Sequence, residues 1–160
     1  MAIPYKQERR KYDRYATEAK IYFRVTYDLK TKIEFQVVDK DKGRSLSKKY
    51  AAVSKNVSAE ALCFTCKHKL KEGDFLLLDV YLPSGKKPIH MEGRVVWSQA
   101  TAPQQKLRQL FEAGVRLVMV DGSSVKESIY FDSAHQVTWS AVLESVFGNF
   151  RKLAQKSRTS

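Results

Sequence analysis

Short segments in which apolar and polar residues alternate fill most of the chain, and they limit its fold more than any other feature. Alternation with a period of two is typical of a strand that has one face in the core. The alternating segments are residues 21–25, 33–37, 50–57, 62–64, 75–82, 89–98 and 113–120. Turn-forming residues lie between them, as in Lys71-Glu72-Gly73-Asp74 and Pro83-Ser84-Gly85. Seven short strands joined by turns predict a mostly β protein, either an antiparallel barrel or a sandwich.

The pattern changes in the C-terminal part of the chain. Ser124-Val125-Lys126-Glu127 has the form of a capping box, which predicts the start of a helix. From about Ser133 onward, apolar residues recur at helical spacing: Trp139, Val142, Leu143, Val146, Phe150 and Leu153. We expect a C-terminal helix that packs on the barrel or on a partner, with Gly148 weakening its interior by roughly 1 kcal/mol. The chain then divides into a flexible basic arm (1–17), a barrel (18–122), and a helix with a basic tail (123–160).

The charge of the chain favours anionic partners. Lys and Arg number 29 against 17 Asp and Glu, a formal net charge of +12. Nucleic acid, a phosphorylated small molecule, or an acidic protein or lipid surface would fit this excess, although solubility alone would also explain it. No apolar run approaches the roughly 18 residues of a spanning helix, and the N-terminal residues lack the apolar core of a signal peptide. A cytoplasmic protein is therefore expected, and the presence of only two cysteines agrees with a reducing compartment.

Two arginines of the basic arm, Arg10 and Arg14, form an Arg-x-x-x-Arg pair. The guanidinium group is a flat fork of donors that matches two acceptors at once. Guanine offers such acceptors at N7 and O6, and phosphate oxygens suit the same fork. Two arginines on a flexible arm could therefore hold a guanine nucleotide from two sides. The alternative is a solvated basic tail.

A second polar motif, Asn56-Val57-Ser58-Ala59-Glu60-Ala61, follows the expected strand at 50–57. Asn56 and Ser58 are two residues apart, so both could face one side where the strand ends. A carboxamide in this place can contact a guanine edge, and a hydroxyl can donate to a phosphate oxygen. The alternative is an ordinary polar turn in which both side chains bond their own backbone.

Together these motifs resemble the PilZ domain family. Its signature is Arg-x-x-x-Arg on an N-terminal arm, followed by (Asp/Asn)-x-Ser-x-x-Gly in the barrel. Arg10 and Arg14 match the first part, and Asn56, Ser58 and Ala61 stand at the positions of the second. The layout is also similar in Leu70–Asp74, in Gly93-Arg94-Val95-Val96-Trp97 and in Ala113-Gly114-Val115-Arg116-Leu117. The resemblance extends from about residue 8 to residue 153.

The resemblance implies a six-stranded antiparallel barrel with a helix and a bacterial receptor for cyclic di-GMP. No catalytic activity and no cofactor are expected, because the sequence contains no nucleophile–base arrangement and no glycine-rich phosphate-binding loop. By the same resemblance, Arg10 and Arg14 would clasp guanine and phosphate, Asn56 would contact a guanine, and Ser58 a phosphate. An arginine just before the first motif, here Arg9, implies that the ligand binds as an intercalated dimer.

The chain departs from the family pattern in two places. Ala61 stands where the family has glycine, which changes how closely the ligand can approach. The segment between Arg14 and Asn56 is also longer than the family's, and it predicts an added hairpin around residues 30–49. A degenerate adaptor that binds no nucleotide therefore stays open as an alternative, as does a nucleic-acid-binding barrel.

Other candidate sites have weaker support. Cys63 and Cys66 have redox spacing, and His68 lies nearby, but residues three apart on a strand face opposite sides and no fourth ligand is close in sequence. No metal site is expected. The sequence predicts a packing role for Trp97, on the barrel or against the helix. We expect the ligand to order the arm against the barrel, creating a surface that an unknown partner protein reads.

Overall fold

The computed structural model describes residues 26–83, 85, 87–101, 109–134 and 136–148. Several predictions fall outside this part of the chain. The expected strand at 21–25, the basic arm and the residues Phe150 and Leu153 are among them.

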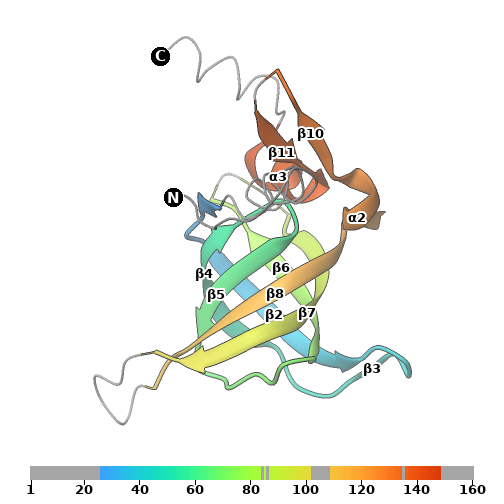
Figure 1. The fold of residues 1–160 in the computed structure, drawn as a ribbon. Coiled ribbons are helices and arrows are strands. Elements are labelled where there is room, and N and C mark those ends of the chain that lie inside the picture. Colours follow the sequence, from blue (N-terminus) through green and yellow to red (C-terminus); the bar gives the residue numbers. More distant parts are fainter. Residues whose placement is uncertain (1–25, 84, 86, 102–108, 135, 149–160) are drawn as a thin grey trace, which may run out of the picture.

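Six antiparallel strands close into a barrel (Figure 1). They are β2 (Lys32–Asp39), β4 (Tyr50–Val57), β5 (Ala61–Cys66), β6 (Phe75–Tyr81), β7 (Ile89–Ala100) and β8 (Phe111–Val120). The order around the barrel is β4, β5, β8, β7, β6 and β2, and β2 pairs again with β4. Three short strands extend it: β1 (Tyr27–Asp28), β3 (Arg44–Ser45) and β9 (Ser123–Ser124). The predicted mostly β fold, with a six- to seven-stranded antiparallel barrel, is confirmed.

The alternating pattern fills the interior of the barrel directly. Three apolar residues of β2 lie opposite three of β6 in register, and all six are buried: Ile33 with Val80, Phe35 with Leu78, and Val37 with Leu76. Phe64 of β5 adds its ring 5.2 Å from that of Phe35, between ring centroids. Because side chains alternate between faces, the residues between these point to the outer wall.

The predicted hairpin after β2 is present. Val38 pairs with Ser45, and Asp39 with Arg44, so that β2 and β3 flank a tight turn. Gly43 closes this turn at φ 65°, a left-handed conformation that glycine adopts without a steric penalty, and its amide donates to the Asp39 carbonyl. The hairpin follows the C-terminal end of β2, and its residues do not line the site described below.

The C-terminal part begins as predicted and then differs. Ser124 caps α2 (Val125–Ser128) by accepting a hydrogen bond from the Glu127 amide, so the predicted start of a helix is confirmed. The predicted continuous helix from about Ser133 is wrong at its start. Here β10 (Tyr130–Asp132) and β11 (Val137–Trp139) form a hairpin, and α3 (Ala141–Phe147) begins only after Ser140. Trp139 satisfies the helical spacing of apolar residues but lies on a strand, because Val137, Thr138 and Trp139 all have high strand propensity.

Gly148 has a different role from the predicted one. It lies at the C-cap of α3 with φ 85°, and its amide donates to the Glu144 carbonyl. It therefore ends α3 in place of weakening a helix interior. None of the helices in the described ranges has the length and apolar character required to cross a membrane.

Ser140 joins this C-terminal part to the barrel. Its hydroxyl donates to the Ala59 carbonyl over 2.6 Å and accepts from the Leu143 amide as the N-cap of α3. Both Ser140 and Ala59 are buried. Figure 1 shows α3 and the β10–β11 hairpin above the end of the barrel at which β4 turns into β5. The turn that carries the second motif is therefore tied to the start of α3.

Candidate functional site

A hollow of about 690 Å³ lies on the outer wall of the barrel, across β4, β5, β7 and β8. Asn56, Ser58 and Ala61 all line it, so the structure brings together the three predicted residues of the second motif. This volume is within the range of about 300–1,000 Å³ that small-molecule sites occupy. We call it the ligand hollow.

Four residues form one row across the floor of the ligand hollow. Asn56 pairs with Cys63, Cys63 with Gly114, and Gly114 with Trp97, each on a neighbouring strand. One polar side chain therefore stands at one end of the row and one indole at the other. Gly114, which has no side chain, and the half-buried Cys63 lie between them, so no large side chain rises from the floor of the ligand hollow.

Irregularities in two strands aim the ends of this row outward. In β4 the inward residues are Ala52 and Ser54, and simple alternation would point Asn56 inward as well. The register shifts between Ser54 and Asn56, so one additional residue is inserted and Asn56 lies on the outer wall.

A second shift in β7 has the same effect on Trp97. It occurs between Val95, which is buried, and Trp97, which is 39% exposed. The sequence predicts only a packing role for Trp97. It does pack on the barrel, but on the outer wall, with part of its indole open to the ligand hollow. No local sequence pattern indicates that Trp97 lies on the outer wall, because its position depends on how β7 pairs with β8.

Gly114 makes room for the Trp97 indole. A Cβ atom at this position would lie 2.1 Å from Trp97 Nε1 and 2.5 Å from its Cε2. Any residue larger than glycine would therefore push the ring away. The Ala-Gly-Val-Arg segment of β8 thus carries a glycine that shapes the ligand hollow.

The turn between β4 and β5 is held by its own hydrogen bonds. The Ser58 amide donates to the Ala61 carbonyl over 2.8 Å, and the Ala61 amide donates to Ser58 Oγ over 3.1 Å. Ser58 is only 4% exposed, so its hydroxyl serves the turn as the alternative interpretation expected. It still has its own hydrogen to donate.

Ala61 occupies the glycine position of the motif without backbone strain. Among the described residues, the non-glycine residues with positive φ are Asp121 and Gln136, so Ala61 does not need the left-handed freedom of glycine. The methyl group adds a small apolar surface to the ligand hollow and has no cost in backbone conformation.

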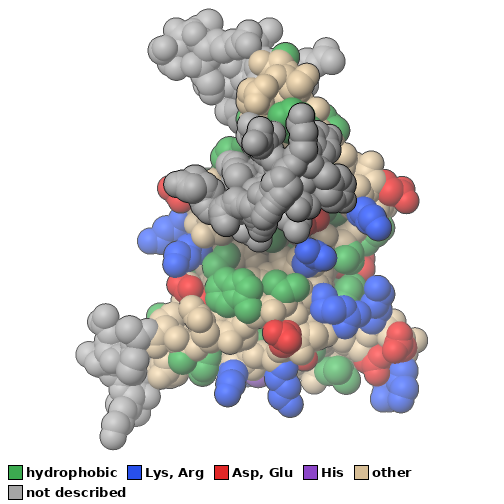
Figure 2. Space-filling model, viewed as in Figure 1, with side chains coloured by type: hydrophobic (Ala, Val, Ile, Leu, Met, Phe, Trp, Pro, Cys, Tyr) green, Lys and Arg blue, Asp and Glu red, His purple; other side chains and the backbone are tan. Residues whose placement is uncertain are grey.

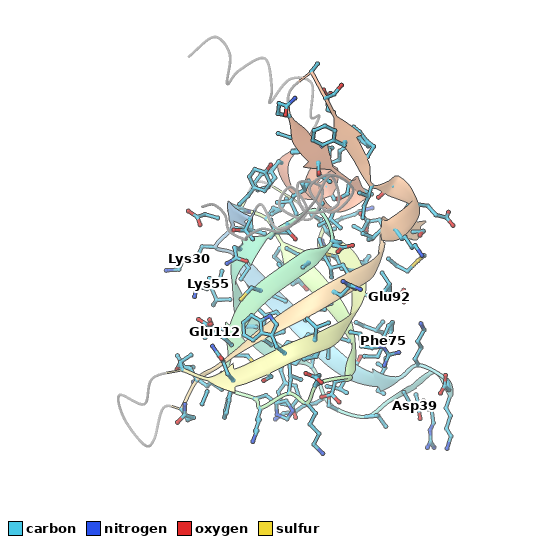
Figure 3. All side chains as sticks on the ribbon, in the orientation of Figure 1. Lys30, Asp39, Lys55, Phe75, Glu92 and Glu112 are labelled. Atoms are coloured by element: carbon cyan, nitrogen blue, oxygen red, sulfur yellow. The ribbon has the colours of Figure 1, made fainter. Side chains whose placement is uncertain are left out.

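Two ion pairs flank the row. Lys55 Nζ lies 2.9 Å from Glu112 Oε2, and Arg116 Nη2 lies 3.7 Å from Glu60 Oε1. All four residues line the ligand hollow, so its cations already have counter-ions. Glu112 also raises the pKa of Lys55, which stays protonated. Figure 2 shows an apolar patch at the centre of this face with basic side chains on both sides, and Figure 3 shows Lys55 beside Glu112.

The two cysteines are thiols on opposite faces of β5, as the strand spacing predicts. Cys66 is buried, whereas Cys63 is half-buried in the floor of the ligand hollow. Burial raises the pKa of both thiols, so both are protonated and uncharged near neutral pH. Cys63 therefore contributes a neutral surface to the ligand hollow.

The arginines of the first motif, Arg9, Arg10 and Arg14, lie outside the described residues. Their position relative to the ligand hollow stays a prediction. Four residues for which the sequence predicted no ligand-binding role enter the ligand hollow through cross-strand pairing: Trp97, Gly114, Lys55 and Arg116.

Comparisons with known proteins found a matching family model and similar solved structures. The family model of the PilZ domain matches residues 8–130. Curated proteins gave no match. Similar solved structures include the inhibitor of motility MotI/DgrA of Bacillus subtilis (14% identity, 64% of this chain and 45% of that chain, TM-score 0.45). Another is the PlzA protein of Borreliella burgdorferi in complex with c-di-GMP (8% identity, 68% and 49%, TM-score 0.45). A third is the PilZ domain with c-di-GMP of YcgR from Escherichia coli (10% identity, 86% and 98%, TM-score 0.46). The chain spans about half the length of the first two.

Proposed function

The chain belongs to the PilZ domain family, and we propose that it is a receptor that binds cyclic di-GMP in the ligand hollow. The observation that carries this proposal is the row from Asn56 to Trp97, which places an amide and an exposed indole at opposite ends of one open floor. A guanine base presents polar edges and an apolar face, and these two side chains complement both. We infer a binding role and no catalysis.

Each part of the site suits one part of the ligand. The Asn56 amide hydrogen-bonds a guanine edge, and the Trp97 indole stacks on a base face. The free hydroxyl hydrogen of Ser58 donates to a phosphate oxygen. Arg10 and Arg14 reach over from the arm and clasp guanine and phosphate, and Arg9 favours two ligand molecules per chain.

Ligand binding orders the basic arm against the barrel, and a partner protein reads the resulting surface in the bacterial cytoplasm. Ordering the arm costs conformational entropy, which charge-assisted hydrogen bonds to the ligand must exceed. The contact between Ser140 and Ala59 supports a route from the motif turn to α3, because both groups are buried and directly bonded.

An isothermal titration of the full chain with cyclic di-GMP tests this proposal. We expect saturable binding, and about 10-fold weaker binding for Asn56→Ala, since one hydrogen bond to a base contributes about 1.5 kcal/mol. Gln36→Ala, on β2 outside the ligand hollow, is the matched control and should bind as the wild type does. A folded wild type that gives no heat would favour the adaptor. Tighter binding of single-stranded DNA with a steep salt dependence would favour the nucleic-acid barrel.

The two ion pairs predict that removing a carboxylate strengthens ligand binding, in contrast to Asn56→Ala, which should weaken it. Glu60 and Glu112 compete with ligand phosphates for Arg116 and Lys55. Glu60→Gln should therefore bind cyclic di-GMP several-fold more tightly, since removing a carboxylate near a bound phosphate relieves repulsion. Glu127→Gln on α2 removes the same charge away from the ligand hollow and should change little. Weaker binding by Glu60→Gln would show that the carboxylate assists the ligand.

A further inference from the structure

A second hollow of about 920 Å³ lies on the outer wall along β4 and β5. We call it the β4–β5 groove and define it by Lys30, Lys32, Lys55 and Lys67 around Val53 and Leu110. Val53 is 45% exposed and Leu110 36%, so the groove presents apolar surface to solvent. Lys55 lines both hollows, which makes the groove a neighbour of the ligand hollow.

The charge of the groove is unbalanced. Four lysines line it, and no Asp or Glu is among its described lining residues. Lys55 is paired with Glu112, and Lys32 lies 3.9 Å from Glu34, at the limit of an ion pair. Lys30 and Lys67 are exposed and have no carboxylate within 4.0 Å in the described parts of the chain. Figure 3 shows Lys30 and Lys55 at the same edge of the barrel.

The strand geometry gives the groove a regular repeat. Ala51, Val53 and Lys55 are the outward residues of β4 that line the groove, at steps of about 7 Å. Lys32 pairs with Val53, and Val53 pairs with Thr65, so a lysine lies beside an exposed apolar residue of this wall. An extended peptide has the same repeat as the strand and could place an aliphatic side chain on Val53 with carboxylates at the lysines.

We propose that the β4–β5 groove binds an extended, acidic segment of a partner protein that also carries aliphatic residues. The lysines can form ion pairs with carboxylates, and the exposed Val53 and Leu110 can make apolar contacts with aliphatic side chains. The two ends of this chain do not fit, because residues 151–160 hold four Lys or Arg and no acidic residue, and the arm is also basic.

The aromatic side chain at the groove favours a protein over a nucleic acid as the occupant. Binding of single strands relies on aromatic faces on which bases stack. Tyr50 is already stacked on His68, with ring centroids 4.2 Å apart and an interplanar angle of 12°. Lys48 Nζ lies 5.7 Å from the centroid of the same Tyr50 ring. Tyr50 is thus engaged in contacts within the protein.

The test uses the full chain and a fluorescein-labelled ten-residue peptide with the repeat Glu-Glu-Leu-Leu, with binding followed by fluorescence anisotropy. In an extended chain this repeat places both Glu and Leu on each face. We expect saturable binding that weakens as the salt concentration rises. The affinity should fall at least about 10-fold in Lys30→Glu/Lys67→Glu, because the introduced carboxylates repel those of the peptide. The matched control is Lys71→Glu/Lys126→Glu, two exposed lysines outside the groove with the same change in net charge. Val53→Thr should weaken binding several-fold, because it removes apolar contact while keeping a β-branched shape.

The outcomes separate the proposal from its rivals. Equal loss in the two double variants would show a general charge effect and overturn the proposal, as would an undetectable interaction with the peptide. Tighter binding of an equally labelled ten-nucleotide single strand, lost in Lys30→Glu/Lys67→Glu, would identify a nucleic-acid groove in its place. Because Lys30 and Lys67 do not line the ligand hollow, titration of the same variant with cyclic di-GMP tests the receptor function separately.

Discussion

Replacing both Arg10 and Arg14 by alanine is expected to weaken cyclic di-GMP binding by about 100-fold or more in calorimetric titration. Each guanidinium group can make two charge-assisted hydrogen bonds to a guanine edge or a phosphate, and such contacts contribute about 1.5–3 kcal/mol each. Losing two arginines therefore costs at least about 3 kcal/mol, which is more than the 10-fold change expected for Asn56→Ala. The barrel should melt at an unchanged temperature, because residues 10 and 14 precede β1, the first strand in the described part of the chain.

The control for this prediction removes the same charge from the same arm. Lys6→Ala/Lys11→Ala lowers the charge of the arm by two and should weaken binding only slightly, mostly at low salt. Arg10→Lys/Arg14→Lys keeps the charge but loses the fork, and should bind nearly as weakly as the alanine variant. If Lys6→Ala/Lys11→Ala weakened cyclic di-GMP binding as much as Arg10→Ala/Arg14→Ala does, the arm would act by charge alone, which contradicts the clasp.

The barrel could be predicted from the sequence because its main signal is local. Ile33, Phe35 and Val37 alternate with polar residues along one strand, and a single face of a strand needs no knowledge of its neighbours. The helix prediction failed for the opposite reason. Residues 139, 142, 143 and 146 are all buried and fit one helical stripe, yet the first belongs to a strand. Spacing alone does not show where one element ends and another begins.

The ligand hollow could be predicted only in part. Asn56, Ser58 and Ala61 are adjacent in sequence and form a motif, so they were found. Trp97 and Gly114 meet because β7 and β8 pair with a shifted register, and this shift has no local signature. The same holds for the ion pair between Lys55 and Glu112, which are 57 residues apart. Residues that reach a site through cross-strand pairing require the structure.

Two glycines of neighbouring strands should give contrasting results when each is replaced by alanine. A Cβ at Gly93 would lie 2.6 Å from the Arg116 carbonyl oxygen and 2.5 Å from Val115 Cγ1. The carbonyl belongs to the backbone of β8, so relief requires β7 and β8 to separate. We expect Gly93→Ala to lower the free energy of unfolding by about 3 kcal/mol, the upper range for an overpacked core. Urea-induced unfolding followed by circular dichroism measures this.

Gly114→Ala should instead spare the fold and damage the ligand hollow. The three atoms nearest to the added Cβ all belong to the Trp97 indole, at 2.1 to 2.8 Å, and Trp97 is 39% exposed, so its ring can rotate into solvent. We expect unfolding to change by about 1 kcal/mol or less, while cyclic di-GMP binding weakens about 10-fold, as the loss of one stacked base predicts. Trp97→Ala should show the same weakening, and the double variant should be no worse than either, since both changes remove one ring from one place. If Gly114→Ala bound the ligand as the wild type does, the indole would have no part in holding the base, and the row across β4, β5, β8 and β7 would lose its functional meaning.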